Sequence, residues 1–186
     1  FYIIGISWTS YVLHASIFNG IISLATYFLL REFGLKIYYC FLYSLLFSLL
    51  GYTSSGTPFV DHHSTFFCLL AVYSLLFAIK NEKNIFWILI PIFLGFAFLS
   101  KQVPAFYIFI ILLIIIIIYL FTLKKIDPLK SILLGTILFI FFMILLILFS
   151  GIKFESFINQ YILYPQSIGN DRFNNFKPTF HGIVSH

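Results

Sequence analysis

Long apolar stretches separated by short polar turns make up most of the chain. A helix that crosses a membrane needs about 20 apolar residues, with a range of about 17–25. Stretches of this kind predict membrane spans over Tyr11–Leu30, Leu35–Tyr52, Ser64–Ile79, Ile85–Leu99, Val103–Leu123 and Ser131–Ile152. The fourth and fifth of these belong to one apolar run, which the polar turn Ser100-Lys101-Gln102 divides. We therefore predict an all-α fold, a polytopic transmembrane helix bundle of about six spans.

The segment after the last span has a different character. It mixes Asn, Gly and Pro with aromatic residues, which predicts an interfacial helix around Phe154–Leu163 followed by a turn-rich segment. We predict two parts, a membrane core over residues 1–152 and an extracytoplasmic segment over residues 153–186. The only methionine is Met143, so we expect the chain to be a fragment of a longer protein that lacks its first span.

The composition supports a membrane protein. Of the 186 residues, 61% are hydrophobic and 9% are charged, against roughly 25% charged in soluble domains. The formal charge of +5 does not predict nucleic-acid binding, because the basic residues lie between apolar segments and do not cluster. Cys40 and Cys68 both lie inside apolar runs, which predicts small buried side chains and no disulfide or metal site.

Basic residues in the short turns predict the direction of the spans. The turn over Thr53–His63 has no Lys or Arg, and the turn over Ser100–Gln102 has Lys101 alone. The turns at the other ends of the spans hold Arg31, Lys36, Lys80, Lys83, Lys124, Lys125 and Lys130. The positive-inside rule places these basic turns in the cytoplasm. The Thr53–His63 turn, Lys101 and the C-terminal segment then share the periplasmic face of a bacterial inner membrane.

The sequence PFVDHHSTFF places three ionisable residues where the third span begins. Asp61 has a structural interpretation as a helix cap, since it can accept free backbone N–H groups at the positive end of the helix. The functional alternatives are a general base for an arriving hydroxyl, or a ligand that holds a divalent cation against a lipid phosphate. His62 and His63 would point about 100° apart on a helix. A metal site at Asp61 and His62 would need more ligands, such as Asp171, His181 or His186.

Lys101 interrupts a long apolar run where an uncharged polar turn would have served. One interpretation is snorkelling, with the aliphatic stem in lipid and the ammonium among the phosphates. The other is a dedicated partner, the phosphate of a lipid-linked substrate, which a lysine binds as a point charge. Gln102 beside it, His62 and His63, and Arg172 in the tail are further candidates for substrate binding.

Three short motifs occur in a familiar order, and they cover about residues 10–125. They are Leu30–Gly34 after the first span, Val60-Asp61-His62 at the third, and Gly95–Lys101 (GFAFLSK). Their order and spacing resemble those of the GT-C membrane glycosyltransferases. The closest branch contains the dolichyl-phosphate-mannose protein mannosyltransferases and the bacterial lipid A aminoarabinose transferases. The Val-Asp-His-His string is also similar to a loop of oligosaccharyltransferase catalytic subunits, another GT-C branch.

The resemblance implies an enzyme that moves a sugar from a polyprenyl-phosphate carrier to a lipid, glycan or protein acceptor on the extracytoplasmic face. In such enzymes acidic residues of the outer loops serve as base or metal ligand, so Asp61 matches that position and a divalent cation is the implied cofactor. Lys101 matches the motif lysine near the carrier phosphate. This chain departs from the pattern because the principal catalytic carboxylate of the family lies in a first outer loop, after a first span that we expect this chain to lack.

Two other classes of function stay open. A lipid transporter or flippase would favour ionisable residues along the spans, and His14 is the one candidate within them. We interpret His14 as an interhelical hydrogen-bonding residue. The third class is a non-catalytic subunit of a membrane assembly, which an upstream segment without an acidic outer loop would support.

Overall fold

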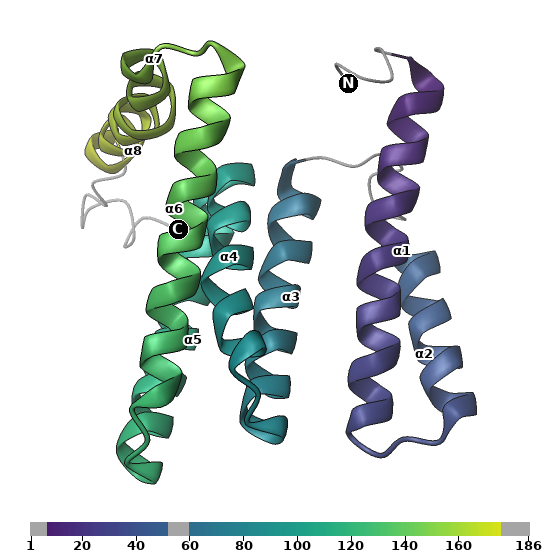
Figure 1. Cartoon of the computed structure of the whole chain (residues 1–186). Helices are drawn as coiled ribbons and strands as arrows, with labels where there is room; N and C mark the ends of the chain where they lie inside the picture. The colour runs from purple at the N-terminus through teal and green to yellow at the C-terminus, as the bar shows by residue number, and fades with distance from the viewer. Residues whose placement is uncertain (1–6, 52–59, 176–186) are drawn as a thin grey trace, which may run out of the picture. The chain divides into compact units, whose positions relative to one another are not determined.

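The chain is all-helical over the residues that the structure describes, as predicted. The structure, a computed structural model, describes residues 7–51 and 60–175 (Figure 1), and for residues 60 and 171–175 the backbone only. Within these ranges no strand occurs. In chain order the helices are α1 (Trp8–Glu32), α2 (Ile37–Leu50), α3 (Val60–Asn81), α4 (Asn84–Ser100), α5 (Gln102–Leu123), α6 (Asp127–Ser150), α7 (Phe154–Ile158), the π-helix η1 (Asn159–Leu163) and α8 (Tyr164–Asn175).

Four of the described helices, α1, α3, α5 and α6, are long and apolar enough to cross a membrane. The chain is therefore a membrane protein with at least these candidate spans. The other two predicted spans correspond to α2, with 14 residues, and α4, with 17 residues. At 1.5 Å per residue these helices rise about 21 Å and about 26 Å, less than the hydrocarbon core of about 30 Å.

Three helices, α1, α3 and α6, begin three or four residues earlier than the apolar pattern predicts, because polar residues form part of their first turns. Ahead of α1, Ser7 and Ser10 form a reciprocal capping box, in which each hydroxyl oxygen accepts the backbone N–H of the other at 3.0–3.1 Å. The third helix already includes Asp61, which lies in its first turn and not ahead of it. The carboxylate is still at the positive end of the helix dipole.

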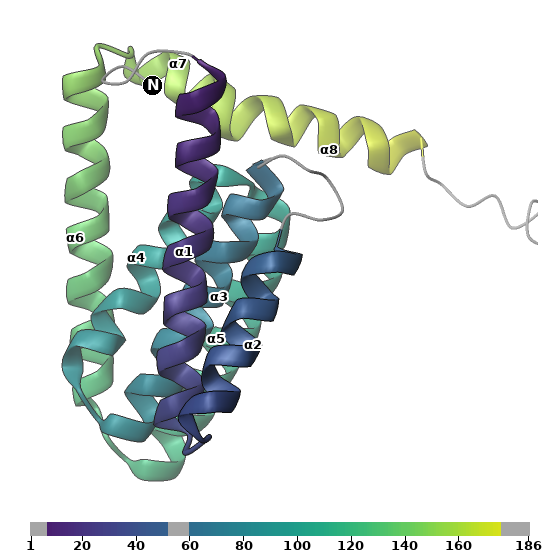
Figure 2. The ribbon, with the colours of Figure 1, turned by 90° about the vertical axis from the view of Figure 1, so that its right-hand side faces the viewer.

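The best-packed part of the molecule is formed by α3, α4 and α5. The fourth helix lies along α3, and α1 lies along α2 (Figures 1 and 2). The fifth helix contacts both α3 and α4, and α1 also contacts α3. Trp87 is only 1% exposed and is the largest side chain in this core. The buried residues of the core are Ala71, Leu75, Ala78, Trp87, Ile90, Leu94, Leu112 and Ile116.

A glycine sets how closely α6 approaches α4. A Cβ atom at Gly135 would collide with the backbone carbonyl oxygen of Ile88 and would lie 2.8 Å from Cγ of Pro91. Small residues at helix contacts in membranes allow such close backbone packing. Gly135 therefore has a structural role in holding the first half of α6 against the core.

The chain divides into two compact units, with the boundary between Phe139 and Ile140 inside α6. In the second unit α7, η1 and α8 follow one another without a break in helical backbone, and Figure 2 shows them as one continuous arm. The predicted helix over Phe154–Leu163 is present. The predicted turn-rich segment after it is wrong as far as Asn175, because this stretch is α8.

Pro165 favours a turn after Leu163, yet the helix continues through it. The π-helix η1, which immediately precedes α8, explains why. A proline inside an α-helix clashes with the carbonyl four residues earlier. Immediately before Pro165, the Tyr164 N–H donates to the carbonyl of Asn159, five residues back. This wider turn relieves the crowding, since π-helical turns insert one extra residue into the helix.

Candidate functional site

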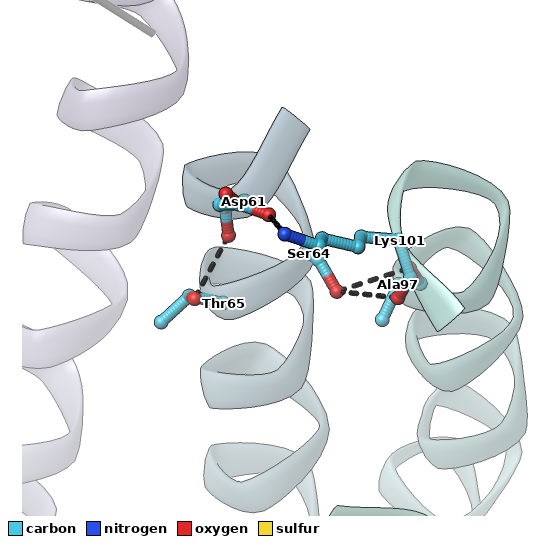
Figure 3. A network of polar contacts seen from close by, with 5 residues as sticks. All are labelled: Asp61, Ser64, Thr65, Ala97 and Lys101. Atoms are coloured by element: carbon cyan, nitrogen blue, oxygen red, sulfur yellow. Dashed lines mark hydrogen bonds and ion pairs between the residues drawn. The ribbon is translucent and has the colours of Figure 1, made fainter. Parts of the chain in front are cut away.

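Asp61 and Lys101, which are far apart in the sequence, form an ion pair. Asp61 lies in the first turn of α3, and Lys101 is the single residue between α4 and α5. Nζ of Lys101 contacts Oδ1 of Asp61 (Figure 3). The two side chains remain 44% and 52% exposed, so both charged groups are accessible to a ligand. The structure thus brings together the two residues on which the sequence analysis depends most.

The backbone of Lys101 is held in a defined conformation. Its φ of −158° and ψ of 127° are extended, which interrupts the helical backbone between α4 and α5. The Lys101 N–H still donates to the carbonyl of Ala97, at 2.9 Å, as the last bond of α4. Lys101 is thus a non-helical residue with helical backbone on both sides, and its side chain extends across to α3.

Ser64 ties the start of α3 to the end of α4. Its side chain is completely buried, and its Oγ lies 3.1 Å from the carbonyl oxygen of Ala97 and 3.0 Å from that of Lys101 (Figure 3). Residues three apart on a helix share a face, so Ser64 lies behind Asp61 on the face toward α4. Ser64 is not among the site residues predicted from the sequence. The available signal was a serine three residues after the carboxylate in an otherwise apolar helix.

Small residues continue this contact below the ion pair. Cys68 is 4% exposed, and Ala97 and Ala105 are completely buried against it. Such side chains let α3, α4 and α5 approach closely. Both cysteines are free and buried, so the prediction of small buried side chains at Cys40 and Cys68 is confirmed.

His63 belongs to a different face of α3. Its ring stacks on the ring of His14 from α1, with centroids 4.9 Å apart and an interplanar angle of 17°. Phe18 packs edge-on against both imidazoles, each at 4.8 Å. The three consecutive residues therefore diverge as the helical geometry predicts, with Asp61 directed to Lys101 and His63 to α1.

Of the other candidate residues, the structure describes the side chains of some and not of others. His62 in α3 and Gln102 in α5 are both half-buried neighbours of the ion-paired residues in the sequence. Arg172 and Asp171 lie in α8, where the structure describes the backbone only. Lys177, another tail residue that carries a basic side chain, and the potential ligands His181 and His186 lie outside the described residues.

A metal site at Asp61 and His62 would need at least one more ligand. Across residues 7–51 and 60–175 no group of three or more His, Cys, Asp or Glu side chains is arranged to hold a metal ion. The described contact of the Asp61 carboxylate is with the Lys101 ammonium. We therefore assign no chemical step to a metal ion.

The motif over Leu30–Gly34 has a clear structural role at the end of α1. Gly34 has a φ of +87°, a left-handed conformation that favours glycine. The Gly34 N–H donates to the Arg31 carbonyl at 3.0 Å, and the Leu35 N–H donates to the Leu30 carbonyl at 3.2 Å. These two bonds form a Schellman motif, which ends the helix and satisfies its last carbonyls.

The pair of Asp61 and Lys101 combines two chemical capacities. An ammonium can bind a phosphate as a point charge, and a carboxylate beside it can accept a proton from a hydroxyl group. Both capacities need partial exposure and a fixed backbone, which these residues have. Comparisons of the chain with protein-family models, with curated proteins and with solved structures gave no match.

Proposed function

We propose that this chain belongs to an inverting membrane glycosyltransferase that takes its sugar from a polyprenyl-phosphate carrier. The observation that carries the proposal is the ion pair between Asp61 and Lys101. A carboxylate and an ammonium in contact at one end of a membrane helix bundle match the two demands of this reaction. The acceptor must lose a proton, and the carrier phosphate must leave as an anion.

The reaction divides between the two side chains. An acceptor hydroxyl attacks the anomeric carbon of the sugar, and the bond from that carbon to the phosphate oxygen breaks. The electron pair of this bond leaves with the polyprenyl phosphate, whose charge the Lys101 ammonium balances. The hydroxyl proton passes to the Asp61 carboxylate. A positioned base of this kind typically contributes about 10²–10⁴-fold to the rate.

In this proposal the Asp61 carboxylate and the Lys101 ammonium form their ion pair when no substrate is bound. Binding of the carrier phosphate draws the Lys101 ammonium toward the ligand and releases the carboxylate for the acceptor. Ser64 keeps the Lys101 backbone in place during this exchange, because its hydroxyl bonds the Lys101 carbonyl and not the side chain.

The proposal includes a topology. All of the six predicted spans cross the bacterial inner membrane, and the Asp61–Lys101 end faces the periplasm. The basic residues at the opposite helix ends support this orientation, since Lys80, Lys83 and Lys124 follow the positive-inside pattern.

The direct test is sugar transfer in membranes that contain the chain or its variants. Asp61→Asn and Lys101→Ala should each lower transfer from a polyprenyl-phosphate-linked sugar by about 100-fold or more while protein abundance is unchanged. The matched control is Glu82→Gln, which removes a carboxylate from another ion pair at the far end of the same helices. Wild-type transfer by both Asp61→Asn and Lys101→Ala would refute the proposal.

A second candidate is transport, and the stacked imidazoles of His14 and His63 favour it. Ionisable side chains that face one another between membrane helices are typical of proton and substrate pathways. Uptake of a lipid-linked sugar into proteoliposomes with no covalent product would support transport over transfer. His14→Phe and His63→Phe should then lower uptake, whereas a transferase should tolerate them because the rings still pack.

A further inference from the structure

A small polar hollow lies at the end of the helices opposite to the Asp61–Lys101 pair. It has a volume of about 340 Å³ and is bounded by the start of α4, the end of α5 and the start of α6. Ligand pockets in proteins range from about 300 to 1,000 Å³, so this one suits a small group such as a lipid headgroup. The residues that line it and carry the argument below are Glu82, Trp87, Tyr119, Lys125, Asp127 and Lys130.

The lining carries balanced charge in two exposed ion pairs. Nζ of Lys125 lies 2.6 Å from Oε1 of Glu82, and Nζ of Lys130 lies 3.0 Å from Oδ1 of Asp127. Their side chains are 45–78% exposed, and exposed ion pairs contribute little to stability, so both can exchange partners readily. A lone anion would occupy the ammonium groups and leave two carboxylates without counter-charges. A ligand with one anionic and one cationic group supplies a counter-charge to the lysines and to the carboxylates alike.

Aromatic side chains and the position of the loops place the hollow at headgroup level. The partly buried Tyr119, whose ring packs on that of the core residue Trp87 at 5.2 Å between centroids, lines the hollow, and Tyr is enriched where membranes meet water. Glu82 follows the end of α3, and Lys125 follows the end of α5, both candidate membrane spans. Their charges belong outside the hydrocarbon core because burying them there is costly.

We propose that this hollow binds the phosphoethanolamine headgroup of a membrane phospholipid. The phosphate would bind the ammonium groups of Lys125 and Lys130, and the ligand ammonium would bind the carboxylates of Glu82 and Asp127. A primary ammonium donates hydrogen bonds to carboxylates, which a quaternary choline cannot do, and a glycerol headgroup has no cation at all. The site therefore prefers phosphatidylethanolamine over phosphatidylcholine and phosphatidylglycerol.

The experiment is native mass spectrometry of the full chain, purified in detergent and mixed with the three phospholipids with identical acyl chains. Wild-type protein should retain phosphatidylethanolamine several-fold more than either of the others. Glu82→Gln combined with Asp127→Asn should lower that retention to the phosphatidylcholine level. Glu32→Gln is the matched control, since Glu32 lies at the end of α1 and outside the lining of the hollow, so its loss should leave retention unchanged.

A soluble competitor distinguishes a lipid from a free metabolite with the same headgroup. Glycerophosphoethanolamine in tenfold excess should leave the lipid bound, because the acyl chains hold the headgroup at the membrane surface. Displacement by this compound would overturn the assignment to a lipid. Equal retention of the three phospholipids by wild-type protein, or a preference for phosphatidylglycerol, would overturn the proposed site even if the double variant did not fold.

Discussion

The two ends of α3, α4 and α5 each carry an ion pair between a residue near α3 and a residue near α5, and the two pairs are supported differently. At one end Asp61 lies within α3, and Lys101 has its carbonyl bonded to the buried Ser64. At the other end Glu82 and Lys125 lie in turns, and the turn residues Glu82 and Lys124 have left-handed φ values of 54° and 52°.

This difference separates the ion pair of the candidate catalytic site from the ion pair of the proposed headgroup site. The charges and the exposures of the two pairs are similar, so neither property distinguishes them. What distinguishes them is the buried Ser64 hydroxyl, which hydrogen-bonds the carbonyl oxygens of Ala97 and Lys101. These bonds fix the backbone from which the Lys101 side chain extends. Fixed positioning is what catalysis requires, since misplaced groups lose much of their effect.

The largest expected effect comes from exchanging the charges of the first pair. The double variant Asp61→Lys with Lys101→Asp restores an ion pair, so protein abundance and the thermal unfolding midpoint should stay near wild type. Sugar transfer should remain about 100-fold or more below wild type, because the base and the phosphate-binding group have changed places. Recovery of transfer in the exchanged variant would mean that the pair has only a structural role.

An intermediate effect is expected when the support of Lys101 is removed. Ser64→Ala deletes a hydrogen bond that typically contributes about 0.5–1.5 kcal/mol, so transfer should fall by up to about tenfold. The loss should appear mainly as a raised KM for the polyprenyl-phosphate donor, and Ser64→Thr should restore part of it.

The control for Ser64 is its neighbour Thr65. The Thr65 hydroxyl donates to the Asp61 carbonyl within the same helix, at 2.8 Å, and does not bridge two helices. Thr65→Val should therefore leave the KM for the donor unchanged. An equal rise in KM for both variants would show that local helix stability, and not the position of Lys101, accounts for the loss.

The smallest expected effect is at the opposite ion pair, and it depends on pH. The hydrogen bond that Lys125 donates to the Glu82 carboxylate raises the pKa of Lys125 above its ordinary value of 10.5. A raised lysine pKa means that the pair stabilises the fold fully below that ordinary value. This stabilisation is lost as the pH rises through the raised value, where the folded lysine also loses its proton.

Lys125→Met should therefore lower the unfolding midpoint slightly at pH 8, and the difference from wild type should vanish at the most alkaline pH that the protein tolerates. Unfolding in detergent, followed by circular dichroism at several pH values, measures this difference. Transfer should change less than about twofold at neutral pH, since an exposed ion pair contributes little. A large loss of transfer would show that the two ends do not differ in function as proposed.

Several features of the molecule follow from the sequence alone. Long apolar runs determine that the chain is helical and belongs in a membrane, because a backbone in hydrocarbon must satisfy its own hydrogen bonds. The interruptions at Arg31, Lys80, Lys101 and Lys124 correctly separate α1 from α2, α3 from α4, α4 from α5, and α5 from α6. The charge at Asp61 was already visible at the start of a span.

Only the tertiary structure decided which side chains meet. It paired Lys101 with Asp61, placed Ser64 behind them and stacked His63 on His14, and none of these contacts could be derived from the pattern. The physical reason is that helices that are apolar on all sides carry no stripe to mark which face is buried. Helix existence depends on local composition, whereas the rotation and depth of one helix against another depend on packing along their whole length.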